Sequence, residues 1–213
     1  TNHSETRFIG AGGEWIVAAQ VELEQPWRGR EKLVEMLASV IDECLAPGEP
    51  PEPGTLPLLL CVAEQDRPGR LDGLDDRLFA QLAERTSVQF DPKLSSVVAY
   101  GRVAAAVALS RASDLIHRHG VDRVLIVAAD SLLLWPTLSA YYEQGRLLVP
   151  GNSNGFVPGE AAGAVMVSSR PGVGPRLFCA GLGFSQEKST VLSDAPLRGD
   201  GLAAAIKEAL ADA

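Results

Sequence analysis

Residues 155–167 read Gly-Phe-Val-Pro-Gly-Glu-Ala-Ala-Gly-Ala-Val-Met-Val, and they decide the fold more than any other part of the chain. They begin inside a segment rich in glycine and proline, residues 151–159, which is expected to form a loop. Small and apolar residues then follow from Ala161 to Ser168, and this run predicts a strand. The stretch is therefore interpreted as a loop that leads directly into a strand.

A second strand and the strongest helix of the chain precede this stretch. Val124–Ala129 is a continuous apolar run, which is typical of a parallel strand covered on both faces, and Asp130 and Ser131 follow its carboxyl end. Val103–His117 is alanine-rich and predicts a helix that packs closely against a sheet. Gly120 stands where a helix commonly ends in a left-handed residue.

Strands and helices alternate along the rest of the chain, and this alternation predicts an α/β fold with a mostly parallel, layered sheet. Apolar runs and helical spacing give the individual elements. Strands or extended segments are expected at Phe8–Ile9, Trp15–Leu23, Leu56–Val62, Leu94–Ala99 and Leu177–Phe184, and helices at Glu31–Leu45, Leu71–Arg85, Thr137–Gln144 and Leu202–Ala213. Residues 47–54 are a polar connector rich in proline.

The composition excludes some classes of protein. Of 213 residues, 46% are hydrophobic, enough for a sizeable core, and the formal net charge of −8 opposes binding to nucleic acid. The longest apolar run is far too short to span a bilayer. Three widely spaced cysteines, an odd number, favour a reduced, cytoplasmic compartment.

Gly10-Ala11-Gly12-Gly13 follows an expected strand and suggests a dinucleotide-binding loop. Such a loop needs a helix whose N-terminus faces the pyrophosphate, whereas Glu14-Trp15-Ile16 is expected to be extended. A tight turn is therefore favoured, and no cofactor is expected.

Gly151-Asn152-Ser153-Asn154-Gly155 fits the G-x-S-x-G pattern of α/β-hydrolases. That pattern requires a strand before it and a helix after it, but Pro150 and Pro158 flank it here. The catalytic histidine of those enzymes also follows the serine, and all three histidines of this chain precede Ser153. A hydrolase is not expected.

The histidines and cysteines offer no metal site and no nucleophile. His117 and His119 are two residues apart and point to different sides of a helix, which favours a solvated helix end. Cys61 lies inside an apolar strand, where burial keeps a thiol protonated. Cys44 in a helix tail and Cys179 in an expected strand have no histidine beside them.

Two segments together resemble the β-ketoacyl synthase family. The first is Ala99–Leu133, with its alanine-rich helix, glycine, apolar strand and Asp-Ser-Leu end. The second is the opening stretch, in which Gly155, Phe156, Gly159 and Glu160 match the family's glycine loop, G-F-V-x-G-E-G-A-G. The resemblance implies a thiolase-like fold built from two similar βαβαβ halves. Residues 8–169 would form the N-terminal half and residues 177–213 the start of a second, truncated half, so that a longer native protein is expected.

The departures from the family concern the chemistry. The family's nucleophilic cysteine stands at the turn between a strand and the alanine-rich helix, where the helix N-terminus lowers its pKa. That turn corresponds here to Tyr100-Gly101-Arg102 and contains no cysteine. Ser95 and Ser96 precede it inside the expected strand, and the family's histidines belong to its second half. No residue of the chain is therefore assigned a catalytic role.

The resemblance thus implies a β-ketoacyl-synthase-like protein of fatty-acid or polyketide metabolism that does not condense acyl groups, a pseudoenzyme acting as a binding or partner subunit. Its partners would be an acyl-carrier protein, an acyl-coenzyme A, a second copy of itself, or a ketosynthase-like subunit. With the last of these it would form a heterodimer whose active site lies in the partner, as chain-length-factor-like subunits do. The alternative is an active acyltransferase of the 3-oxoacyl synthase type, completed by the second half of a longer chain. A dimer is expected in either case, with the edge strand Leu94–Ala99 at its seam.

Overall fold

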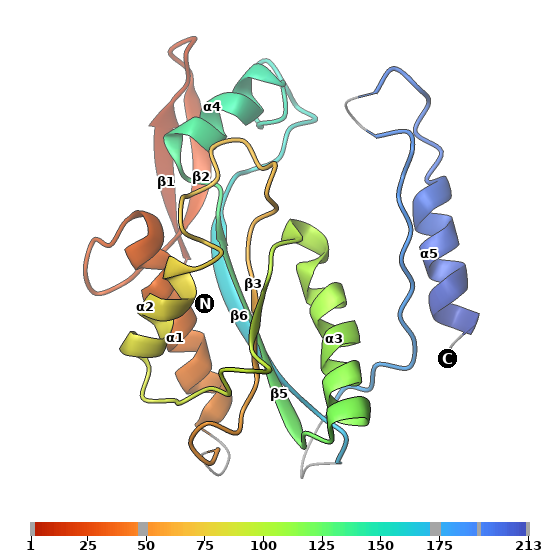
Figure 1. Cartoon of the computed structure of the whole chain (residues 1–213). Coiled ribbons are helices and arrows are strands. Elements are labelled where there is room, and N and C mark those ends of the chain that lie inside the picture. Colours follow the sequence, from red (N-terminus) through yellow and green to blue (C-terminus); the bar gives the residue numbers. More distant parts are fainter. Residues whose placement is uncertain (1–2, 47–50, 171–175, 191–192, 212–213) are drawn as a thin grey trace. The chain divides into compact units, whose positions relative to one another are not determined.

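The computed structural model describes residues 3–46, 51–170, 176–190 and 193–211, and it divides into two compact units, Thr1–Ser169 and Arg170–Ala213. Helices and strands alternate in the first unit, while the described residues of the second contain one helix (Figure 1).

A four-stranded sheet forms the middle of the first unit. Its strands are β3 (Leu58–Cys61), β4 (Ser96–Val98), β5 (Arg123–Ser131) and β6 (Glu160–Ser168), in the order β4-β3-β5-β6. β3 runs parallel to β4 and to β5, so the sheet is mostly parallel as predicted. β6 is antiparallel to β5, because the connection 132–159 returns the chain to the same end of the sheet, where Ser131 pairs with Glu160.

Helices cover the sheet on both faces (Figure 1). The helices α1 (Gly29–Leu45) and α2 (Arg77–Arg85) pack on one face, and α3 (Ala104–His119) packs on the other. Alternate residues of β5 point to the two sides, so that Leu125 lies in the core beneath α1 and Ile126 in the core beneath α3. The continuous apolar run predicted for this strand is explained by these two covered faces.

The helix α3 has the alanine stripe that close packing on a sheet requires. Ala104, Ala108 and Ala112 are buried at intervals of four residues. The helix ends at Gly120, whose φ of 69° lies in the left-handed region, as predicted from the sequence.

A separate hairpin consists of β1 (His3–Ile9) and β2 (Trp15–Val21). Its turn is closed by the amide of Gly13, which donates to the carbonyl of Gly10 at 3.0 Å, and Gly13 has a φ of 85°. A strand follows this glycine turn, which confirms the prediction of a tight turn and excludes a dinucleotide-binding loop. The helix α4 (Trp135–Glu143) packs its buried Leu138 with Ile16 of β2.

Several predicted boundaries differ in the first unit: β3 is shorter than the predicted run Leu56–Val62, and β1 begins at His3 rather than at Phe8. The helix predicted from Leu71 begins only at Arg77, because Gly73 has a φ of 75° and the Asp76 carboxylate accepts from the amide of Arg77. β4 is shorter than the predicted run Leu94–Ala99, although it lies at the edge of the sheet as predicted.

The second unit contains α5 (Asp200–Ala211), in agreement with the predicted helix. The strand predicted at Leu177–Phe184 is wrong, because no described residue forms a ladder with this segment and its backbone is irregular. None of the described helices has the length and apolar content that crossing a membrane requires.

Candidate functional site

The sequence resemblance assigns the nucleophile turn of a condensing enzyme to the turn between β4 and α3, and this assignment stays a prediction. The turn contains Tyr100, Gly101 and Arg102 and continues as a 3₁₀ turn, Gly101–Val103, into α3. The amide of Gly101 donates to the carbonyl of Val62 at 3.1 Å, which fixes the turn beside the end of β3. Gly101 has a φ of 52°, so this position strongly favours glycine.

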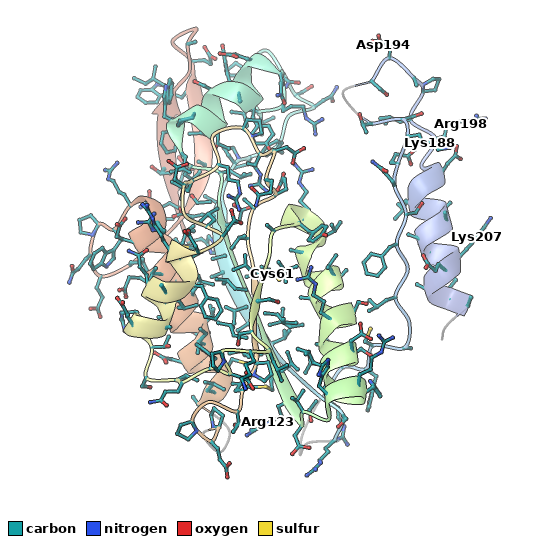
Figure 2. The ribbon with its side chains drawn as sticks, viewed as in Figure 1. Cys61, Arg123, Lys188, Asp194, Arg198 and Lys207 are labelled. Carbon is teal, nitrogen blue, oxygen red and sulfur yellow. The ribbon has the colours of Figure 1, made fainter. Side chains whose placement is uncertain are left out.

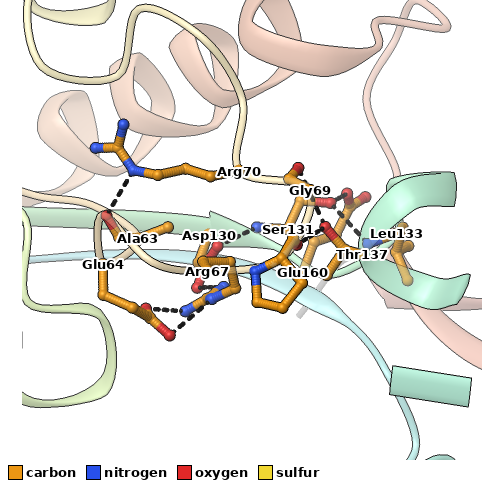
Figure 3. A network of polar contacts seen from close by, with 11 residues as sticks. Ala63, Glu64, Arg67, Gly69, Arg70, Asp130, Ser131, Leu133, Thr137 and Glu160 are labelled. Atoms are coloured by element: carbon orange, nitrogen blue, oxygen red, sulfur yellow. Dashed lines mark hydrogen bonds and ion pairs between the residues drawn. The ribbon is translucent and has the colours of Figure 1, made fainter. Parts of the chain in front are cut away.

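The side chain of Glu64 occupies the space beside Gly101. A Cβ atom at position 101 would collide with the Glu64 carboxylate. That carboxylate is held by two hydrogen bonds from Arg67, one from Nε to Oε1 at 3.0 Å and one from Nη2 to Oε2 at 2.6 Å (Figure 3). A paired carboxylate therefore fills the space in which a side chain at position 101 would begin.

Arg67 joins this turn to the end of β5. Its side chain is only 3% exposed, and its Nη1 donates to Oδ2 of Asp130 at 2.7 Å. Burial by itself would raise the pKa of Glu64, but the hydrogen bonds and charge of Arg67, with a smaller effect from Arg102, outweigh burial and lower that pKa. Burial works in the opposite direction on Arg67, and its two carboxylate partners overcome it and raise the arginine's pKa. Glu64 and Arg67 are thus held in their charged forms.

Tyr100 and Arg102 are exposed residues of this turn. The tyrosine is 52% exposed and lies 6.0 Å from the guanidinium of Arg111, a cation–π contact, while Arg102 is exposed. Neither is buried or paired in the manner of an activated nucleophile. The structure places Tyr100, Gly101 and Arg102 in the turn that precedes α3, and none of the three is a cysteine.

The glycine loop before β6 is fixed by packing. A Cβ atom at Gly155 would collide with the backbone of Leu147, and one at Gly159 would approach the carbonyl of Ala19 at 3.2 Å. The ring of Phe156 meets that of Tyr141 edge-on, at 5.4 Å between centroids. These residues join β6 to β2 and α4.

Glu160, at the end of this loop, is the centre of a second buried polar network. Its Oε2 accepts from Oγ of Ser131 at 2.8 Å, its Oε1 accepts from the amide of Val21 at 3.0 Å, and Lys32 of α1 forms an ion pair with it. The side chains of Glu160 and Lys32 are 3% and 11% exposed. This network ties β2, α1, β5 and β6 together, and Ser131 lies beside Asp130 of the first network (Figure 3).

The three cysteines lie outside the turn at Gly101. Cys61 is buried between β3 and α3 (Figure 2), and burial, opposed weakly by Arg111, raises its pKa to about 11. Burial also raises the pKa of Cys44 in α1. Cys179 is exposed in the second unit. The prediction that Cys61 is an inert thiol within a strand is consistent with this environment, whereas Cys179 does not lie in a strand.

The structure places the remaining sequence motifs in an exposed turn and at an exposed helix end. Ser153 is exposed in a turn that no helix follows, so the G-x-S-x-G match is not a nucleophile elbow. His117 lies exposed at the end of α3, where its Nδ1 contacts the carbonyl of Ser113 at 2.8 Å. Among the residues that the structure describes, no group of three or more His, Cys, Asp or Glu side chains could hold a metal ion.

Comparisons with known proteins identify the fold. No protein-family model matches the chain, and no curated protein matches it either. Among solved structures, the chain is similar to a ketosynthase (ApeO) in complex with its chain length factor (ApeC) from Xenorhabdus doucetiae, with a TM-score of 0.59 and 14% sequence identity. The match covers 99% of this chain and 60% of the solved chain. The chain therefore has a ketosynthase-like α/β fold and spans 60% of the length of the solved protein it matches.

Proposed function

We propose that this chain is a ketosynthase-like subunit that does not condense acyl groups itself and acts by pairing with another subunit. The observation that supports the proposal is the turn at Gly101, to which the resemblance assigns the nucleophile and where the Glu64 carboxylate, paired with Arg67, fills the space beside the backbone. A Claisen condensation needs a thiolate to carry the acyl group and donors for the developing oxyanion. The described turn offers a paired carboxylate instead.

Binding of an acyl chain by this subunit has less support than its pairing with another subunit. A pocket does lie beside Arg67, between α1 and the end of β5, and it is lined in part by Leu33, Leu74 and Thr137. Its space is about that of one water molecule, too small for an acyl chain. Recognition of an acyl-carrier protein or acyl-coenzyme A would have to use another surface of the molecule.

The edge strand β4 is the surface proposed for pairing. The carbonyl of Val97 accepts a long contact of 3.5 Å from Arg111, and it therefore points away from β3. Because the N–H and C=O of one strand residue point to the same side, the amide of Val97 also faces the open edge. We propose that a ketosynthase-like subunit, or a second copy of this chain, pairs along this edge.

The alternative proposal is an active acyltransferase. It is favoured by one observation: 40% of the solved ketosynthase lies outside the match, so a longer protein has room for catalytic groups that this chain lacks. Turnover of malonyl and acyl thioesters by the full-length protein, surviving Tyr100→Ala and Arg102→Ala, would favour it.

The partner proposal is tested by co-expression with the cysteine-bearing ketosynthases of the same host. We expect a stable complex on size-exclusion chromatography that is lost in Val97→Pro, which removes the outward-facing amide without touching the ladder to β3. Glu143→Ala serves as the control, because Glu143 is exposed in α4 and lies outside the four-stranded sheet. Co-purification of no ketosynthase, together with saturable binding of acyl-coenzyme A or acyl-carrier protein, would replace this proposal by the acyl-binding one.

A further inference from the structure

The outer edge of β1 has the properties of a pairing surface for a second copy of the chain. β1 pairs with β2 along the whole length His3–Ile9, and no other strand of the described chain forms a ladder with it. One edge of a seven-residue strand is thus left without ladder partners. Such an edge is a template for another strand unless its side chains prevent pairing.

The hairpin turn shows which backbone groups face this open edge. The amide of Gly10 donates to the carbonyl of Glu14, so these opposed residues form a hydrogen-bonded pair. Hydrogen-bonded and non-hydrogen-bonded pairs alternate along an antiparallel ladder. Phe8, Thr6 and Ser4 therefore direct their backbone groups toward β2, and the odd-numbered residues His3, Glu5, Arg7 and Ile9 direct theirs outward.

The two charged side chains of β1 lie on these outward-facing residues and have opposite signs. Glu5 and Arg7 share the exposed face of the hairpin, with side chains 57% and 59% exposed, and they form an ion pair at 2.8 Å. Charged side chains on an edge strand commonly prevent another strand from pairing with it. In β1, the register of a neighbouring strand decides whether Glu5 and Arg7 attract or repel the charges on that strand.

We propose that two copies of this chain pair antiparallel through β1, about a twofold axis at Thr6. In this register Glu5 of each copy lies opposite Arg7 of the other, at hydrogen-bonded positions. An axis at Glu5 would oppose the two glutamates, and an axis at Arg7 would oppose the two arginines. Thr6 is also the midpoint of His3–Ile9, so the register selected by charge is the one that pairs all seven residues.

This pairing is independent of the proposed function, because β1 belongs to the hairpin and β4 to the four-stranded sheet. A subunit paired through β4 keeps its β1 edge open. The two interfaces use different backbone edges, so that each can be tested without the other.

Charge reversal tests the register in the 213-residue chain. In sedimentation velocity at micromolar concentration and low salt, we expect Glu5→Arg and Arg7→Glu each to raise the dissociation constant of the assembly about tenfold or more. The double variant Glu5→Arg/Arg7→Glu restores the opposition of unlike charges and should return it to the wild-type value. A monomeric wild-type chain, or single variants that associate like the wild type, would overturn the proposal.

Disulfide trapping tests the axis directly and separates β1 from β4. In a Cys179→Ser background, Thr6→Cys places the two thiols opposite each other at a non-hydrogen-bonded position, within reach of a disulfide. Ser4→Cys is the control, because its thiols would be four residues out of register, roughly 14 Å apart. We expect covalent dimers from Thr6→Cys alone under mild oxidation. Equal trapping of both variants, or of neither, would rule out the axis, while the β4 pairing and the thioester assays would be unaffected.

Discussion

Replacing Glu160 by alanine is expected to lower the free energy of unfolding by about 3–5 kcal/mol, because it leaves the ammonium group of Lys32 buried without its counter-ion. The substitution also removes the acceptor for Ser131 Oγ and for the amide of Val21. A loss of this size would lower the melting temperature by roughly 10 °C. Urea unfolding followed by tryptophan fluorescence measures it in the first unit, where all three tryptophans lie.

Two further variants show whether the buried charge is the cause. Glu143→Ala removes an exposed carboxylate and should change stability by less than about 0.5 kcal/mol. Lys32→Met added to Glu160→Ala removes the unpaired charge and should recover part of the loss. If Glu160→Ala were as mild as Glu143→Ala, the network would not stabilise the fold in this way.

Replacing Gly101 by alanine is expected to cost about 2–5 kcal/mol, the second large effect. The left-handed backbone contributes about 1–2 kcal/mol of this, and the collision between the new Cβ and the Glu64 carboxylate contributes about 1–3 kcal/mol. Gly145→Ala is the matched control, because Gly145 has a φ of 61° and open space around its Cβ position. It should show the backbone cost alone.

A double-mutant cycle isolates the collision. Glu64→Ala removes the obstacle, at a cost of its own because Arg67 then keeps only Asp130. The double variant Gly101→Ala/Glu64→Ala should therefore be more stable than the sum of the single changes predicts, by about 0.5–3 kcal/mol. Strict additivity in urea unfolding would mean that Glu64 does not fill the space beside Gly101 in solution.

Much of the fold follows from local patterns in the sequence. The strand β5 was predictable because both of its faces are covered, which makes it continuously apolar. The helix α3 and its end at Gly120 were predictable from alanine content and a left-handed glycine. The antiparallel direction of β6 was not, because a strand's apolar pattern is the same in either direction.

The two polar networks could not be found from spacing. Glu64 and Arg67 lie in the turn after β3 and approach Gly101 only through the parallel pairing of β3 with β4. Lys32 and Glu160 are 128 residues apart. One signal was present in the sequence: a glutamate at the start of a small, apolar strand, which burial would force to find a partner.

Intact-mass analysis after incubation with malonyl- and acyl-coenzyme A tests most directly whether this chain carries an acyl acceptor. The turn at Gly101 contains no cysteine that could serve as one. We predict no saturable acyl adduct on any cysteine, while a cysteine-bearing ketosynthase treated in parallel becomes acylated to one group per chain. A stoichiometric thioester on Cys44, Cys61 or Cys179, formed as fast as in that control, would contradict the account.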